Sequence, residues 1–223
     1  NLLVGQVGQG RLNVDGGRVE AGRGIYVGAG TQSGATQGGR GEITVSGGGQ
    51  LVSQDLVLGT SNNATGALTV SGAGSVVDAT IVRVGQNGDG TLRVEGGGVV
   101  TADEVNAEKY DALGSGDFGQ TGSIVVTGAG SAIRAARVDA SNHLLLEAGG
   151  VIESDRAAIK DSYGPTASTA RITGADTRWT NTGVMAISTN LDVLDGAVIR
   201  SDSVNISDGL NDVTMSPALL DEQ

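Results

Sequence analysis

The residues of this 223-residue chain that could do acid–base or metal chemistry are few. His143 is the single histidine, and there is no cysteine. A Ser-His-Asp triad needs its imidazole between a hydroxyl and a carboxylate, but no Gly-x-Ser-x-Gly segment surrounds a nucleophile here. One histidine without cysteine also cannot supply a zinc site. We therefore expect no catalytic residue, no metal and no cofactor, and we interpret His143 as a solvated or capping side chain.

Calcium is the metal that the abundant carboxylates would suit best. The segment from Gly85 to Gly90, Gly-Gln-Asn-Gly-Asp-Gly, resembles the glycine-aspartate nonapeptide that binds calcium in other β-rolls. That motif works in tandem copies, with ligands from neighbouring turns, and here it occurs once. The segment is therefore predicted to be a plain tight turn.

The elements that would position any site come from one repeated phrase. Two apolar-x-apolar pairs, separated by a glycine-rich turn, recur about every 19 to 33 residues along the chain. The first pairs are Leu2-x-Val4, Ile25-x-Val27, Leu56-x-Leu58, Val82-x-Val84, Val105-x-Ala107, Val138-x-Ala140, Ala157-x-Ile159, Met185-x-Ile187 and Val204-x-Ile206. The second pairs are Leu12-x-Val14, Ile43-x-Val45, Leu68-x-Val70, Leu92-x-Val94, Ile124-x-Val126, Leu144-x-Leu146, Ala170-x-Ile172, Leu191-x-Val193 and Val213-x-Met215. Alternation at period two predicts strands.

A third apolar position follows each second pair, after a turn rich in glycine. Because no polar residue enters this column, we assign it to the interior, with Trp179 as a core residue. The column is Val19, Val52, Val77, Val100, Ile133, Ile152, Trp179 and Ile199. Three short strands per repeat predict an all-β, right-handed, single-stranded parallel β-helix of about nine three-strand rungs, each pairing with the next at about 4.8 Å. We expect residues 1–223 to be one β-helix segment of a longer array.

An aspartate recurs just before the first pair of alternate repeats. These acidic residues are Asp55, Asp103, Asp155 and Asp202, and the repeats between them carry Thr80, Ala136 and Gly183. Alternation keeps like charges about two rungs apart. Two interpretations stay open: each carboxylate accepts hydrogen bonds from corner backbone N–H groups, or the column is a ladder for calcium or a partner. Either way this edge is negatively charged.

Three long insertions fall between first and second pairs, so stacked rungs would place all three at one corner. They span residues 31–41, 108–121 and 160–168, and three of the five aromatic residues lie in them. Aromatic residues on loops of a rigid scaffold are typical of binding sites. The predicted binding corner is Tyr110, Phe118 and Tyr163, with Asp111 and Asp117. The alternative is that these loops fold back over the ends of the strands.

Composition agrees with a soluble rod. Glycine accounts for 39 residues, and the formal charge of −11 makes contact with nucleic acid unfavourable. The sequence contains no apolar run long enough for a membrane-spanning helix.

The repeats also carry a family resemblance. The segments Val27 to Gln54, Leu58 to Ala79 and Val84 to Asp103 resemble autotransporter-associated repeats in the passenger domains of bacterial type V secretion proteins. The resemblance implies a β-helical passenger at the outer face of the bacterial outer membrane, or secreted. It also implies that membrane attachment occurs only through a C-terminal barrel outside this segment.

These observations favour adhesion or self-association, as in autoaggregation and biofilm formation, through many weak contacts along the rod. The expected partner is a host-cell or matrix protein, a glycan or another copy of the chain, and not nucleic acid. Two alternatives stay open: an inert stalk that presents another domain, and a carbohydrate-active β-helix enzyme. A pair of carboxylates focused in a groove would favour the enzyme, although we expect none.

Overall fold

The computed structural model describes residues 1–30, 38–107, 121–141, 143–160, 168–207, 213–216 and 219–222, the last two segments as backbone only. The protein is all-β: 72% of the described residues lie in strands, and the described ranges contain no helix. None of these residues forms a helix long and apolar enough to cross a membrane.

Two long parallel sheets make up the fold. The first sheet contains β1 (Leu2–Val4), β3 (Arg18–Val27), β5 (Gln50–Leu58), β7 (Val76–Val84), β9 (Val99–Ala107), β11 (Ala132–Ala140), β13 (Val151–Lys160), β15 (Arg178–Ser188), β17 (Val198–Ile206) and β19 (Leu219–Glu222). The second contains β2 (Gln9–Asp15), β4 (Arg40–Ser46), β6 (Thr65–Ser71), β8 (Asp89–Glu95), β10 (Gly122–Thr127), β12 (His143–Glu147), β14 (Thr169–Thr173), β16 (Leu191–Leu194) and β18 (Val213–Ser216).

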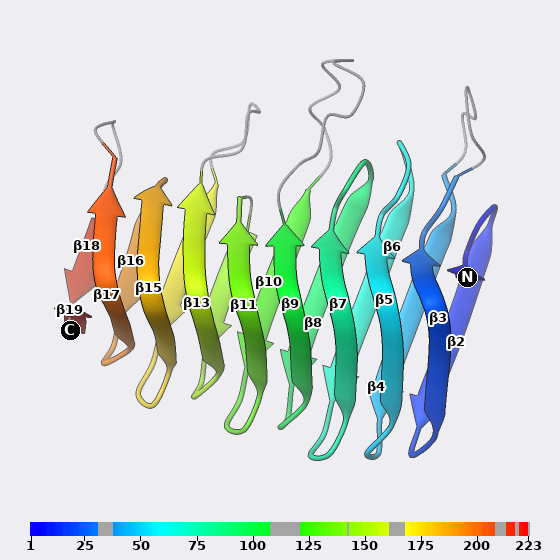
Figure 1. The fold of residues 1–223 in the computed structure, drawn as a ribbon, viewed down its shortest axis with the longest axis horizontal. Helices are drawn as coiled ribbons and strands as arrows, with labels where there is room; N and C mark the ends of the chain where they lie inside the picture. Colours follow the sequence, from blue (N-terminus) through cyan, green and yellow to red (C-terminus); the bar gives the residue numbers. More distant parts are fainter. Residues whose placement is uncertain are drawn as a thin grey trace.

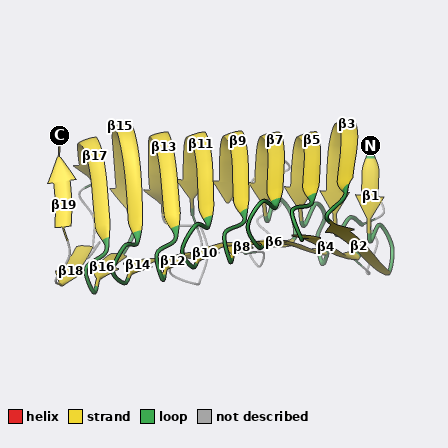
Figure 2. Ribbon diagram, turned by 90° about the horizontal axis from the view of Figure 1, so that it is seen from below, coloured by secondary structure: helices red, strands yellow, loops and turns green. Residues whose placement is uncertain are grey.

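Successive strands alternate between the two sheets. Each odd-numbered strand therefore pairs with the odd-numbered strands before and after it, and the even-numbered strands do the same. Figure 1 shows the odd-numbered strands as a front layer, with the even-numbered strands behind them and the termini at opposite ends. Figure 2 shows the same two layers from below. The apolar core lies between the layers, as is consistent with a β-solenoid.

The predicted columns of first and second apolar pairs are confirmed. Leu56 pairs with both Ile25 and Val82 in the first sheet. In the second sheet, pairing places Val14, Val45, Val70, Val94 and Val126 in one column. All five are buried. Period-two alternation was enough to set these positions, because one face of each strand must be apolar.

The third column differs from the prediction in two ways. It is not a separate strand, since β5 runs through both the predicted third strand of one repeat and the first strand of the next. Leu51, not Val52, occupies its interior position: Leu51 pairs with Val77 and is 1% exposed, whereas Val52 is half-buried beside Asp78. Where two apolar residues are adjacent, the alternating pattern does not predict which of them points inward. Trp179 is fully buried, as predicted.

The turns after the even-numbered strands form a glycine corner with a two-rung period. One kind of turn has two consecutive left-handed residues, as at Gly47 and Gly48, and the other has left-handed residues on either side of an alanine, as at Gly72 and Gly74. The two kinds alternate from β4 to β16. Left-handed backbone favours glycine.

A buried hydroxyl joins the two turns in each of three neighbouring pairs, so that such a contact recurs at every second rung. Ser75 Oγ accepts a hydrogen bond from the Gly48 N–H at 3.2 Å, across one rung. The Gly97 N–H donates to Ser131 Oγ at 3.0 Å, and the Gly149 N–H donates to Thr177 Oγ1 at 2.9 Å. All three hydroxyl residues are at most 1% exposed. The glycine corner is thus a repeated structural joint whose backbone donors are satisfied internally.

Candidate functional site

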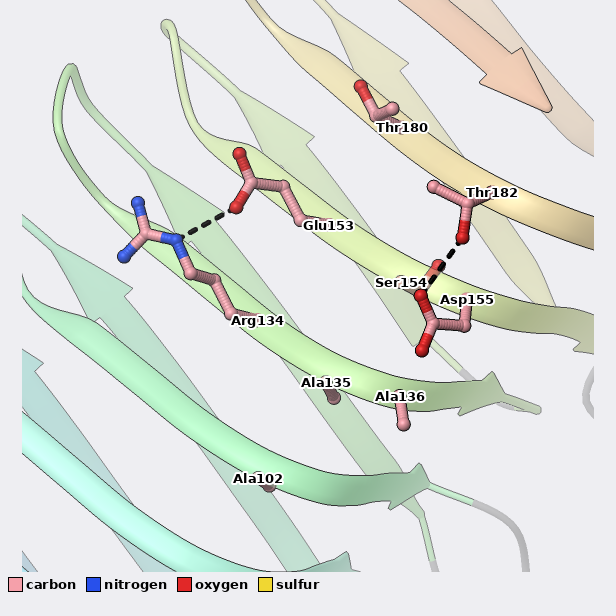
Figure 3. A pocket seen from close by; sticks show the side chains of 9 residues that line it. All are labelled: Ala102, Arg134, Ala135, Ala136, Glu153, Ser154, Asp155, Thr180 and Thr182. Atoms are coloured by element: carbon pink, nitrogen blue, oxygen red, sulfur yellow. Dashed lines mark hydrogen bonds and ion pairs between the residues drawn. The ribbon is translucent and has the colours of Figure 1, made fainter.

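Most long strands of the first sheet are interrupted by two consecutive outward residues, and β15 is interrupted by three. In β13, Ile152 and Ser154 are buried, Asp155 and Arg156 are both exposed, and Ala157 is buried again. The same break in alternation occurs in β11, at Ala136 and Arg137. We call this stretch of the first sheet the bend; Figure 3 shows the strands curving through it.

A groove of about 460 Å³ lies on the solvent side of the bend. It crosses β9, β11, β13 and β15 (Figure 3). Its lining residues are Ala102, Arg134, Ala135, Ala136, Glu153, Ser154, Asp155, Thr180 and Thr182. No aromatic ring is among them.

The polar side chains of the groove are held in pairs across neighbouring strands. Arg134 Nε donates to Glu153 Oε2 at 2.8 Å, and the Thr182 hydroxyl donates to Asp155 Oδ1 at 2.9 Å. Figure 3 shows these as two separate contacts at different places along the strands. The Arg134 and Glu153 side chains are 52% and 44% exposed. A pair this exposed adds little stability but fixes the orientation of its polar atoms.

A buried hydrogen-bond network lies behind the groove. The Trp179 indole N–H donates to Ser154 Oγ at 3.0 Å, and Ser154 Oγ donates to Asn181 Oδ1 at 2.9 Å. Asn181 Nδ2 then donates to Ser201 Oγ at 2.9 Å, and Ser201 Oγ donates to the Gly183 carbonyl at 2.7 Å. Burial without such partners would cost about 1–3 kcal/mol per group.

The network coincides with an irregularity in strand pairing. The register between β13 and β15 shifts after Ser154, and that between β15 and β17 shifts after Asn181. The extra residue in β15 interrupts the regular ladder of backbone hydrogen bonds on both sides of this strand. The Gly183 carbonyl receives its donors from the Asn181 amide and the Ser201 hydroxyl instead.

The structure brings together only part of the predicted acidic column. Register places Ala136 opposite both Asp103 and Asp155, as expected. Asp55, in contrast, pairs with Ile81, one position further along than Thr80, and its carboxylate contacts Arg83 at 3.0 Å. Asp202 is exposed and lies at the register shift between β15 and β17.

For two of these aspartates the partners are side chains. Asp55 contacts a guanidinium, and Asp155 accepts from a threonine hydroxyl. The predicted role as acceptors of corner backbone N–H groups therefore does not describe these contacts. Asp89, which is not in the column, does accept a hydrogen bond from a backbone N–H group: its carboxylate bonds to the Thr121 N–H at 2.9 Å. It belongs to the glycine-rich segment considered above for calcium.

The predicted aromatic corner cannot be placed. Tyr110, Asp111, Asp117, Phe118 and Tyr163 all lie outside the described residues, as do most of the insertions 31–41, 108–121 and 160–168. The strands that follow the insertions, β4, β10 and β14, start in matching register within the second sheet. The three segments therefore enter that sheet at the same edge, while the binding role stays a prediction.

His143 lies on the surface, away from the groove. Its Nδ1 is 2.8 Å from the Thr169 hydroxyl of the neighbouring strand, and the residue is exposed. Within the described ranges, no three His, Cys, Asp or Glu side chains come together as a metal-binding group.

Sequence reasoning missed a buried acid as well as the network. Asp139 occupies an outward position of β11, yet its side chain is only 1% exposed. It pairs with Arg137 at 2.5 Å and lies 3.9 Å from Lys160 Nζ. The sequence signal was available, since Arg137-x-Asp139 places opposite charges on one face of a strand. No signal in the sequence indicated that Asp139 is buried, because no pattern marks this outward position as covered.

The groove thus offers hydrogen-bonding groups on a rigid sheet, without a reactive centre among the residues described. Comparison of the chain with protein-family models, curated proteins and solved structures finds no match.

Proposed function

We propose that this chain is a β-helical passenger segment of a bacterial type V secretion protein, exposed at the cell surface or secreted. It acts in adhesion or self-association through repeated contacts along the rod. Its partner is a host-cell or matrix protein, a glycan or another copy of itself. The family assignment rests on the repeated phrases of the sequence, and the parallel two-sheet fold supports it.

In this proposal the coil is right-handed and has about nine three-strand rungs. Parallel crossover connections within a sheet are right-handed in nearly all proteins. The course of the chain in Figure 1 fits that hand, because the front strands point upward while the chain advances from right to left. The bend supports three strand segments per rung, since it divides each long strand into two.

The observation that carries the functional proposal is the stacking of hydrogen-bonding side chains on outward positions. In the second sheet one such column passes from β2 to β14, and every member is half-buried or exposed. Its polar members are Arg11, Glu42, Thr91, Ser123, His143 and Thr169, with Ala67 between Glu42 and Thr91 as an interruption. Polar groups repeat at about the 4.8 Å strand spacing. Individually weak contacts at that repeat add up by multivalency.

The same regularity would serve an inert stalk, which is the second candidate. The third candidate is a carbohydrate-active enzyme, and the groove brings it into consideration because Glu153 and Asp155 both line it. An acid catalyst of glycoside hydrolysis sits where burial keeps it protonated. Glu153 is instead exposed and ion-paired with Arg134, so we infer no hydrolysis.

An exchange of segments separates adhesion from a stalk. Full-length protein on the bacterial surface is compared with a version lacking residues 1–223 and with one carrying an unrelated β-solenoid of equal length. Adhesion predicts that sedimentation of cell aggregates and attachment to matrix are lost in both altered versions. Full recovery with the unrelated solenoid would identify this segment as a stalk.

A further inference from the structure

The groove at the bend has a shape and chemistry that suit one class of ligand. We propose that it binds a short stretch of a neutral, hydroxyl-rich oligosaccharide, lying across β9, β11, β13 and β15. This inference rests on the proposed adhesion function and names the ligand of one site within it.

The dimensions suit an extended ligand. Crossing four neighbouring strands gives the groove a length of about 14 Å, three strand spacings. Its volume of about 460 Å³ lies within the range of small-ligand sites. Ala136 is the exposed alanine of the lining, and register places it opposite Asp103 on one neighbouring strand and Asp155 on the other.

The polar groups match hydroxyls, which both donate and accept hydrogen bonds. Arg134 offers guanidinium donors, one of which holds Glu153, and Asp155 offers two carboxylate oxygens, one of which holds Thr182. Thr180 and Thr182 add hydroxyls. The exposed Ala136 methyl group gives an apolar patch for the C–H face of a sugar ring. Arg134, Glu153 and Asp155 leave the groove with a formal charge of −1, which suits a neutral ligand.

Other ligand classes fit less well. A peptide strand cannot add to the sheet here, because β9, β11, β13 and β15 already use their backbone groups to pair with one another. An anionic polymer would meet two carboxylates and a chain of charge −11. A metal ion would find both carboxylates engaged by Arg134 and Thr182. A flat aromatic ligand would lack a ring to stack on in this lining.

Binding is measured on the purified chain with neutral oligomers of glucose, galactose and N-acetylglucosamine, displayed at high density on beads. Heparin fragments serve as the anionic comparison. We expect at least one neutral oligomer to be retained and heparin not to be. Retention of heparin alone, or of none of the four, overturns the proposal.

Two substitutions locate the site. Ala136→Trp places a large ring in the groove from an outward position and should abolish retention. Asp155→Asn keeps the shape but removes the charged acceptor, and should weaken binding about tenfold. Ala73→Trp, at an exposed alanine of the glycine corner, is the matched control and should bind as wild type.

A melting curve checks that each variant folds. If Ala136→Trp does not fold, sugar retention by Asp155→Asn alone tests whether the groove is the binding site. Wild-type retention by a folded groove variant, or equal loss in Ala73→Trp, would contradict the site. Cell aggregation is scored separately, so that absence of sugar binding by the unaltered chain, together with intact aggregation, refutes the groove proposal and not the adhesive role of the rod.

Discussion

The glycine corner and the bend are two turning points of the same coil, and they differ in regularity. At the glycine corner two kinds of turn alternate, and Ser75, Ser131 and Thr177 occupy equivalent places in every second rung. At the bend the inward column changes from Ala79, Ala102 and Ala135 to Ser154, Asn181 and Ser201. The register also shifts there.

The difference shows how the rungs around β15 accommodate an extra residue; the register also shifts between β3 and β5, after Ala21, where no such network is described. The alanine rungs need no hydrogen bonds from this column, because their ladder is continuous. The rungs around β15 interrupt the ladder, and polar side chains supply the missing partners. Structural repetition is kept at the glycine corner, while the bend varies in residue type and carries the groove. Variation on a rigid frame is what a binding surface requires.

Trp179→Ala should have the largest effect on the bend. The indole is fully buried and bonds to Ser154, so its loss should lower the free energy of unfolding by about 3–5 kcal/mol. Because each rung touches only its neighbours, amide hydrogen exchange should accelerate in β13, β15 and β17 and stay unchanged in β4, β6 and β8. Uniform acceleration along the chain would argue against a divisible rod.

Asn181→Ala should have the next largest effect. It removes the link between Ser154 and Ser201 and leaves buried polar atoms without partners, at about 1–3 kcal/mol each. The single tryptophan lies in the same network, so its fluorescence during urea unfolding reports the change directly. Ala135→Gly, in the alanine part of the column, is the comparison. A smaller loss for Asn181→Ala than for Ala135→Gly would mean that the network does not stabilise the bend.

Ser131→Ala tests the glycine corner and should destabilise the protein by about 1 kcal/mol. The Gly97 N–H loses its acceptor, although water can reach this turn more easily than the core. Ser131→Thr should be close to wild type, because Thr177 makes the same contact two rungs later. Thermal melting of both variants decides the matter, and equal destabilisation by threonine would contradict the equivalence of the turns.

The ion pair in the groove should matter least for stability. A double-mutant cycle of Arg134→Gln and Glu153→Gln should give a coupling of about 0.2–1 kcal/mol, since both side chains are about half exposed. Urea unfolding in low and high salt measures it, and screening should reduce the coupling. A coupling above about 2 kcal/mol would make the pair a structural element of the bend.

The sequence alone determined the columns of the first and second strands. Ile25, Leu56 and Val82 stack as expected because the inward face of a strand must be apolar at period two. Alternation fails where apolar residues are adjacent, as at Leu51 and Val52, and where two consecutive residues both point outward, as at Gln54 and Asp55. The aromatic corner stays a prediction, because its residues lie outside the described ranges.

Only the tertiary structure decided what the bend contains. Ser154, Asn181 and Ser201 are far apart in the chain and ordinary in type, and they form a network because stacking places them on neighbouring strands. The groove likewise needs Arg134, Glu153 and Thr182 from three different strands. Local sequence fixes which face of a strand a residue takes, but the register between strands determines its neighbours, and register is a property of the whole coil.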